Sequence, residues 1–353
     1  MINICRQIFN GNKVVKEVVL SEKVTAFPAQ CFNGTTSLTN LTPRTFPYVT
    51  TLFDRVHNNL LHNQFNSSAI VGELNFPNVT NVGVKTFWKT KITGVSLPRV
   101  EEIGEGAFEG CTSLTGGLYF AELKKLGSYP FKNCDSITSF SAPKLEVVGS
   151  AALQHCDALT TISLGAACAT NWADSAFSDC GKLTSLTPWP SFSNVTNTYS
   201  KGSPCFYYNP IKSCSSLVGS IELSGPAGLH TIMNDWMDGC NGITSITIRA
   251  PWVTNVVNHA ARNLAPGATI YWNTDKAPRA FGTTVFASKD ANNRARIIVK
   301  NDLDGWKALS GFAAVSDKDK ARTDYPGKKT FGVLQGHTWL VDGNVKGLMI
   351  LIR

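Results

Sequence analysis

Charged residues are scarce in this chain, and it contains no long apolar run. Only 16% of its 353 residues are Asp, Glu, Lys or Arg, whereas 43% are hydrophobic, a composition typical of an ordered protein. No window reaches the roughly 18 apolar residues that a membrane helix needs. The start of the chain, from Met1 to Phe9, also lacks the basic segment and apolar stretch of an export signal. We therefore expect a surface or secreted location only if a signal was removed, and otherwise a virion or the cytoplasm.

The chain also lacks the motifs of catalysis and of metal binding. Its six histidines are scattered, and none stands in a frame that holds a metal: His57, His62, His155, His230, His259 and His337. No nucleophile elbow, phosphate-binding glycine loop or dinucleotide fingerprint is present. His155 precedes Cys156, but adjacent residues point in different directions and do not readily form a nucleophile pair. The sequence predicts a non-enzymatic protein without a cofactor or metal.

The net charge of +8 is uneven, since residues 271–353 hold 14 Lys or Arg against 8 Asp. A basic region can attract nucleic acid. Here the signs alternate, as in the run from Asp317 to Lys320, which is typical of a solvated face. We expect no specific nucleic-acid partner.

One phrase recurs along the chain: Ala-Phe-x-x-Cys-x-x-Leu-Thr-x-Ile, followed by a further apolar residue. Its clearest copy runs from Ile103 to Leu118, and the cysteines of successive copies are 23, 22, 24, 34 and 26 positions apart: Cys111, Cys134, Cys156, Cys180, Cys214 and Cys240. Between Leu159 and Leu164, apolar and hydroxyl residues take turns, which predicts a strand with one buried face. No single unit can bury that face alone, so the units must stack.

The recurring cysteine is expected to form an interior ladder of reduced thiols, because cysteine behaves there as a small hydrophobic residue. In copies without cysteine we assign Thr35, Ser67, Lys89 and Asn263 to this slot. The sequence leaves open the pairing of the cysteines outside the ladder, which are Cys5, Cys31, Cys168 and Cys205.

A period near 23 with a Leu-x-x-Leu-x-Leu core is typical of leucine-rich repeats, in which each unit adds a short strand to a parallel sheet. The phrase resembles, more narrowly, the BspA-like leucine-rich repeats of Bacteroides type, whose unit reads I-G-x-x-A-F-x-x-C-x-S-L-T-x-I. The match runs from about Val24 to Ile298. The resemblance implies a surface adhesin or interaction protein in which no motif residue is catalytic.

We therefore predict an α/β repeat fold: a leucine-rich-repeat solenoid with a parallel sheet on one face, a C-terminal cap and a small β tail. Residues 1–23 are expected to form an N-terminal segment or cap, and residues 24–272 a solenoid of about nine repeats. Residues 273–324 are expected to form the C-terminal cap, and residues 325–353 the tail, which is a candidate docking element.

Insertions in a solenoid form loops on one face, and two repeats carry them. The longer insertion is rich in aromatic residues, which favour contacts with proteins or sugars, although covering the solenoid edge is an equal alternative. With the outward Tyr119, the candidate partner-binding residues are Trp189, Phe192, Tyr199, Phe206, Tyr207 and Tyr208. The other insertion, from Arg44 to Gln64, is predicted to be a covering element with a helical stretch from Thr51 to Asn63.

The tail ends in an apolar run that is too short for a membrane span. It is expected to pack on the cap or to dock onto a partner chain, and its candidate residues are Trp339, Leu348, Ile350 and Ile352. Two functions remain open: adhesion to a protein or glycan ligand on a host or neighbouring surface, and a bacteriophage virion role as a fibre or decoration protein. A homo-oligomer or larger assembly through the tail is compatible with both.

Overall fold

In the computed structural model, the chain divides into two units, Met1–Pro188 and Trp189–Arg353, and each is described by itself. The structure describes residues 2–3, 7–52, 63–166, 173–187, 205–206, 211–223, 231–232, 235–249, 253, 255–256, 259–282, 285–286, 295–299, 301–310, 312–314, 330–334 and 338–342.

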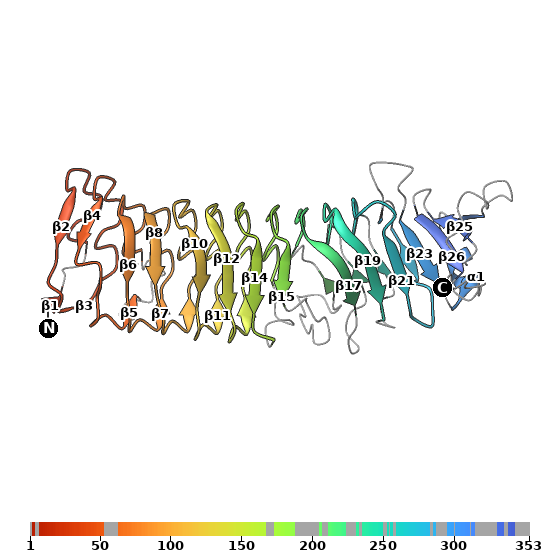
Figure 1. The fold of residues 1–353 in the computed structure, drawn as a ribbon, viewed down its shortest axis with the longest axis horizontal. Coiled ribbons are helices and arrows are strands. Elements are labelled where there is room, and N and C mark those ends of the chain that lie inside the picture. Colours follow the sequence, from red (N-terminus) through yellow and green to blue (C-terminus); the bar gives the residue numbers. More distant parts are fainter. Residues whose placement is uncertain are drawn as a thin grey trace, which may run out of the picture. The chain divides into compact units, whose positions relative to one another are not determined.

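The first unit is a solenoid whose coils contribute strands to two faces, with mostly longer strands on one face and mostly two-residue strands on the other (Figure 1). The longer strands form what we call the long-strand face: β2 (Glu17–Val19), β4 (Asn40–Thr42), β6 (Val71–Asn75), β8 (Lys91–Ser96), β10 (Gly116–Tyr119), β12 (Ile137–Ala142), β14 (Thr161–Leu164) and β15 (Ser185–Thr187). The others form the short-strand face: β1 (Ile2–Asn3), β3 (Val24–Ala26), β5 (Thr51–Leu52), β7 (Asn81–Val82), β9 (Glu102–Ile103), β11 (Lys125–Leu126) and β13 (Val147–Val148). All pairs within these faces are parallel.

The second unit repeats this plan. Its shorter strands are β16 (Cys205–Phe206), β18 (Thr231–Ile232), β20 (Asn255–Val256) and β22 (Ala280–Phe281). Its seven-stranded sheet holds β17 (Val218–Leu223), β19 (Gly242–Ile248), β21 (Thr269–Trp272), β23 (Arg296–Val299), β26 (Thr338–Asp342), β25 (Thr330–Leu334) and β24 (Phe312–Ala314), in that order. The last two strands pair antiparallel, so the tail strands continue the sheet of the solenoid.

The solenoid with parallel strands confirms the fold predicted from the repeat. As expected, Leu159, Ile162 and Leu164 are buried, whereas Thr160 and Ser163 are exposed. Helix is confined to α1 (Leu303–Lys307) in the part of the chain that the structure describes, and no helix there is long and apolar enough to cross a membrane. At the same end, Trp306 is fully buried with its ring centroid 5.1 Å from that of Trp272.

The coils share a turn whose geometry corrects the cysteine-slot assignment. The residue just before the slot has a positive φ in successive coils, as in Gly110 (73°), Asn133 (58°) and His155 (55°). Lys89, Ser67 and Asn263 also have positive φ, so they take this preceding position and the buried slot residues are Thr90, Ser68 and Leu264. Only Thr35 was assigned correctly. Short polar residues such as Asn tolerate positive φ better than bulky ones, so Ser67 and Asn263 suit this position and resemble residues of a small polar slot in the sequence; Lys89 adopts the same φ without this explanation.

Two ladders fill the interior of the first unit. Rings stack coil on coil with centroids 5.0 to 5.5 Å apart, through Phe9, Phe32, Phe65, Phe87, Phe108 and Phe131. Beside them, the Cys111 thiol donates to the Phe87 carbonyl (2.9 Å) and the Cys134 thiol to the Phe108 carbonyl (3.1 Å). The described ladder cysteines are free and buried, as is Cys31. The thiols of Cys111, Cys134, Cys156, Cys180 and Cys240 thus each donate to a carbonyl of the preceding coil, whereas the Cys31 thiol donates to the Gln64 carbonyl of the following coil.

The insertion from Arg44 to Gln64 differs in part from its prediction. Thr51 and Leu52 form strand β5, which pairs with β7, so a helix does not begin at Thr51. The rest of the predicted helical stretch, residues 53–62, lies outside the described residues.

Candidate functional site

The long-strand face is interrupted in front of its bulged strands. In β6 and β10 the two buried residues that frame the strand start are four positions apart, Ile70 to Leu74 and Leu114 to Leu118, whereas Ile137 and Phe140 of the next coil are three apart. The extra residue comes with a positive-φ glycine, Gly72 (85°) or Gly116 (80°). Each bulged strand pairs with the strand that follows it but starts a new sheet. One extra residue is what a β-bulge inserts, and it disrupts the ladder locally.

The break before β10 leaves an open groove, which we call the β8–β10 groove. It has a volume of about 290 Å³ and is lined by residues 95–98 and 117–121. The two coils remain joined beyond both ends, because the Thr115 N–H donates to the Thr93 carbonyl (3.1 Å) and the Lys124 N–H to the Glu101 carbonyl (2.9 Å). On the short-strand face, β7, β9 and β11 pair without a break. The groove is thus a local opening between two coils that stay joined at both of its ends and on the short-strand face.

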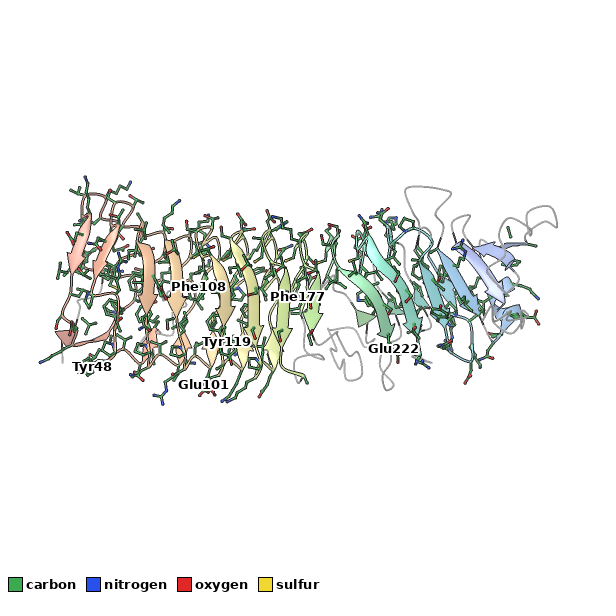
Figure 2. All side chains as sticks on the ribbon, viewed as in Figure 1. Tyr48, Glu101, Phe108, Tyr119, Phe177 and Glu222 are labelled. Carbon is green, nitrogen blue, oxygen red and sulfur yellow. The ribbon has the colours of Figure 1, made fainter. Side chains whose placement is uncertain are left out.

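Tyr119 borders this groove and is the largest exposed side chain there. Its exposed fraction is 66%, and it lies at the end of β10 (Figure 2). It belongs to an outward row of residues, which we call the Tyr119 row. On one side of the groove Tyr119 is in register with Ser141, Ser163 and Thr187, and on the other side Asn75 and Ser96 take the equivalent positions. An aromatic ring with a polar tip among small hydroxyl residues is typical of a contact anchor.

Glycines deepen the same region. A second outward row, the Ser139 row, contains Glu73, Gly94, Gly117, Ser139, Thr161 and Ser185. Gly94 and Gly117 flank the groove and bring no side chain to it. Glu73 fills part of the space above Gly94, since a Cβ added to Gly94 would lie 3.2 Å from the Glu73 Cγ. The polar groups at the rim are therefore a carboxylate, hydroxyls and open backbone.

Ion pairs follow the shorter strands and the turns before them. The Lys124 ammonium lies 2.9 Å from the Glu101 carboxylate, and the Lys144 ammonium 2.7 Å from that of Glu122. These hydrogen-bonded pairs raise the pKa of Lys124 and lower that of Glu122. Because these charges are paired within the chain, this surface offers less to a charged partner than the groove does.

The interior thiols are poorly placed for chemistry. Burial raises the pKa of Cys111 to about 11 and that of Cys180 and Cys240 to about 12. A thiol rather than a thiolate is thus present at neutral pH, and the thiolate is the reactive form. Among the described residues, no group of three or more His, Cys, Asp or Glu is placed to hold a metal ion.

The predicted site residues are placed unevenly. Tyr119 lies at the groove, and Phe206 and Trp339 belong to strands β16 and β26. The other candidates lie outside the described residues: Trp189, Phe192, Tyr199, Tyr207, Tyr208, Leu348, Ile350 and Ile352. Their roles, including tail docking and the virion function that depends on it, stay predictions.

Sequence reasoning found the outward hydroxyl face but missed the groove. The groove volume of about 290 Å³ lies just below the usual range of about 300–1,000 Å³ for ligand pockets. A signal was present, because Gly116–Gly117 lengthens the Leu-to-Leu spacing of this repeat by one residue.

This chain is similar to two solved structures and matches one family model. One solved structure is a leucine-rich repeat protein from Bacteroides ovatus ATCC 8483, with 18% identity over 87% of this chain and 84% of that chain and a TM-score of 0.47. Another is a leucine rich cell surface protein from Faecalibacterium prausnitzii A2-165, with 16% identity over 87% and 85% of the chains and a TM-score of 0.37. No curated protein matches the chain. The family model for the BspA type leucine rich repeat region matches six copies over residues 1–115 and 80–209, which confirms the resemblance, and the chain belongs to this family.

Proposed function

We propose that this protein is a non-enzymatic interaction or adhesion protein that holds a partner protein against the long-strand face of its first unit. The observation that carries the proposal is the β8–β10 groove, an open break in the sheet with the exposed Tyr119 at its border. Membership of a leucine-rich-repeat family is consistent with protein binding, since stacked repeats build extended surfaces for partners.

The chemistry of the face supports contact rather than catalysis. Ser96, Ser141 and Ser163 are small hydroxyl residues that adapt to the groups of a partner. Tyr119 adds apolar area and a phenolic hydroxyl, and residues of this type carry much of the binding energy at protein interfaces. An open polar groove with one aromatic residue at its border is a suitable arrangement for docking a protein segment.

The test is selection of ligands from a displayed peptide library on the immobilised full chain, followed by affinity measurements on two variants. Tyr119→Ser makes position 119 match its row, and we expect it to weaken binding about tenfold or more, which corresponds to about 1.4 kcal/mol. Tyr48→Ser is the matched control, because Tyr48 is 57% exposed but does not line the groove.

Equal losses in both variants, or ligands that bind Tyr119→Ser as well as the unaltered chain, would contradict the proposal. A parallel glycan panel gives a second criterion. If glycans bind through Tyr119 while no peptide does, the partner is not a protein and the proposal is wrong.

A further inference from the structure

The chain itself shows what fits into a break before a bulged strand. Between β4 and β6 the sheet is interrupted as well, but three extra residues, 43–45, follow β4 there. Thr45 forms a parallel bridge with Asn75. The Asn75 N–H donates to the Arg44 carbonyl (2.8 Å), and the Phe46 N–H donates to the Asn75 carbonyl (2.9 Å). An extended segment thus closes this break through backbone hydrogen bonds.

The side chain of Arg44 completes the closure. Its guanidinium donates to the Val71 carbonyl through Nη1 (2.7 Å) and to Asn40 Oδ1 through Nη2 (3.0 Å). It also covers the bulge, since a Cβ added to Gly72 would lie 3.7 Å from the Arg44 Cζ. A guanidinium suits this position because its planar fork of donors matches two acceptors at once.

The β8–β10 groove has the same bulge without the insertion. Leu97 follows Ser96 directly, and Tyr119 takes the strand position that Asn75 takes in β6. Over the described residues, nothing occupies the place opposite Tyr119 that Arg44 and Phe46 occupy opposite Asn75. A Cβ added to Gly116 would meet no atom within 4 Å, in contrast to Gly72. The β8–β10 groove therefore resembles the break before β6, but it lacks the inserted residues that fill that break.

The negative charge near the groove is complementary to an arginine such as Arg44. Gly94 takes the row position of Asn40, and the Glu73 side chain lies over it, with the Cδ atom 3.4 Å from a Cβ added there. A carboxylate thus replaces the amide that accepts from Arg44. Within the described part of the chain, Glu73 has no ion-pair partner, so its charge is available to a cation.

We propose that the β8–β10 groove binds an extended segment of a partner protein that carries an arginine. The segment pairs its backbone with the Tyr119 edge of β10, and the guanidinium lies over Gly116 between the Thr115 carbonyl and the Glu73 carboxylate. This inference rests on the proposed function and names the chemistry of the partner. The shallow volume of about 290 Å³ fits a short segment rather than a folded domain.

The first experiment uses a peptide with the sequence of residues 41–46, Leu-Thr-Pro-Arg-Thr-Phe, blocked at both ends, titrated into the full chain and followed by amide NMR. We expect saturable shifts at the amides of Leu97 and Tyr119. The same peptide with citrulline in place of arginine keeps the shape but loses the charge. It should bind about tenfold more weakly, because hydrogen bonds between charged groups are about twice as strong as neutral ones.

Variants of the protein distinguish recognition of the guanidinium charge from non-specific peptide binding. Glu73→Gln should weaken binding of the arginine peptide about tenfold and binding of the citrulline peptide by clearly less, because only the arginine peptide loses an ion pair. Glu105→Gln is the matched control, since Glu105 is exposed in the turn after β9 and should have no effect. Inserting Pro-Arg-Thr between Ser96 and Leu97 copies the filled break; it should abolish peptide binding while the melting temperature stays close to that of the unaltered chain.

Equal affinity for the two peptides, or full binding by Glu73→Gln, would overturn the inference. If library ligands that need Tyr119 carry no basic residue, the inference fails and the proposed function stands; if no ligand needs Tyr119, the proposed function itself fails. Self-association that depends on Glu73, measured by sedimentation, would also overturn it, because the occupant would then be a second copy.

Discussion

The breaks before β6 and before β10 start from the same local event and end differently. Both strands carry one extra residue and a positive-φ glycine, and both lose their pairing with the preceding strand. Before β6, three residues of the chain restore the pairing, whereas before β10 the backbone edge stays open. Unpaired backbone groups have a cost that favours any partner able to pair them. The difference teaches that a one-residue bulge becomes a binding edge only where the chain does not fill it.

The largest change in the free energy of unfolding is expected in the stacked phenylalanine rings, which run through the coils on both sides of the two breaks. The Phe87 ring lies in the coil of β8, with centroids 5.2 Å from Phe65 and 5.0 Å from Phe108, and it is fully buried. Phe87→Ala should lower the free energy of unfolding by about 3–5 kcal/mol, and Phe87→Leu should lower it by less, because leucine keeps most of the apolar volume. Denaturant unfolding followed by circular dichroism measures both. A small effect of Phe87→Ala would mean that coils on either side stand independently.

The next largest effect concerns the pH dependence of stability, which should differ between the slot residues near the two breaks. The coils at the filled break hold hydroxyls, Thr35 and Ser68, whereas the coil of β10 holds Cys111, whose pKa is raised by burial from 9.0 to about 11. A raised thiol pKa means that the unfolded chain loses its proton first, so stability present below about pH 9 is lost as the pH rises towards 11.

The difference in unfolding free energy between the unaltered chain and Cys111→Ser should therefore shrink across this window, by about 1.4 kcal/mol for each pH unit. Urea unfolding at pH 8, 9, 10 and 11 gives this difference directly, and titration of other groups cancels between the two proteins. A difference that stays constant to pH 11 would show that the Cys111 thiolate is not penalised by burial.

These particular residues also show how far the sequence alone reaches. The apolar period determines which residues are buried, so Leu159, Ile162 and the thiol ladder were predictable. The short-strand face was not, because two-residue strands such as Glu102–Ile103 are too short to show a period of two. The slot residues Ser68 and Thr90 were missed by one position, since backbone dihedrals rather than residue type place them. The groove depends on the pairing of two distant strands, and only the spacing around Gly116 reflects it.

A smaller change in the free energy of unfolding is expected when Arg44, which fills the break before β6, is compared with Tyr119, which lies at the open break before β10. Arg44 donates to the Val71 carbonyl and to Asn40, so Arg44→Ala leaves both acceptors without this donor and should cost about 1–2 kcal/mol at this half-buried position. Tyr119→Ser, at the open break, should change the unfolding free energy by less than about 0.5 kcal/mol. Thermal melts of both variants test the contrast. A larger loss for Tyr119→Ser would mean that Tyr119 serves the fold rather than a partner.

The smallest effect tests whether the two bulges are equivalent in conformation. Gly72 and Gly116 have φ values of 85° and 80°, and an L side chain in the left-handed region costs about 1–2 kcal/mol. A Cβ meets nothing within 4 Å at Gly116 and only an ordinary contact with Arg44 at Gly72, so sterics should add little at either position. Gly72→Ala and Gly116→Ala should thus lower the unfolding free energy by similar amounts. If Gly116→Ala were neutral while Gly72→Ala was costly, the two bulges would differ in the strain that a side chain meets, and the comparison of the two breaks would fail at this point.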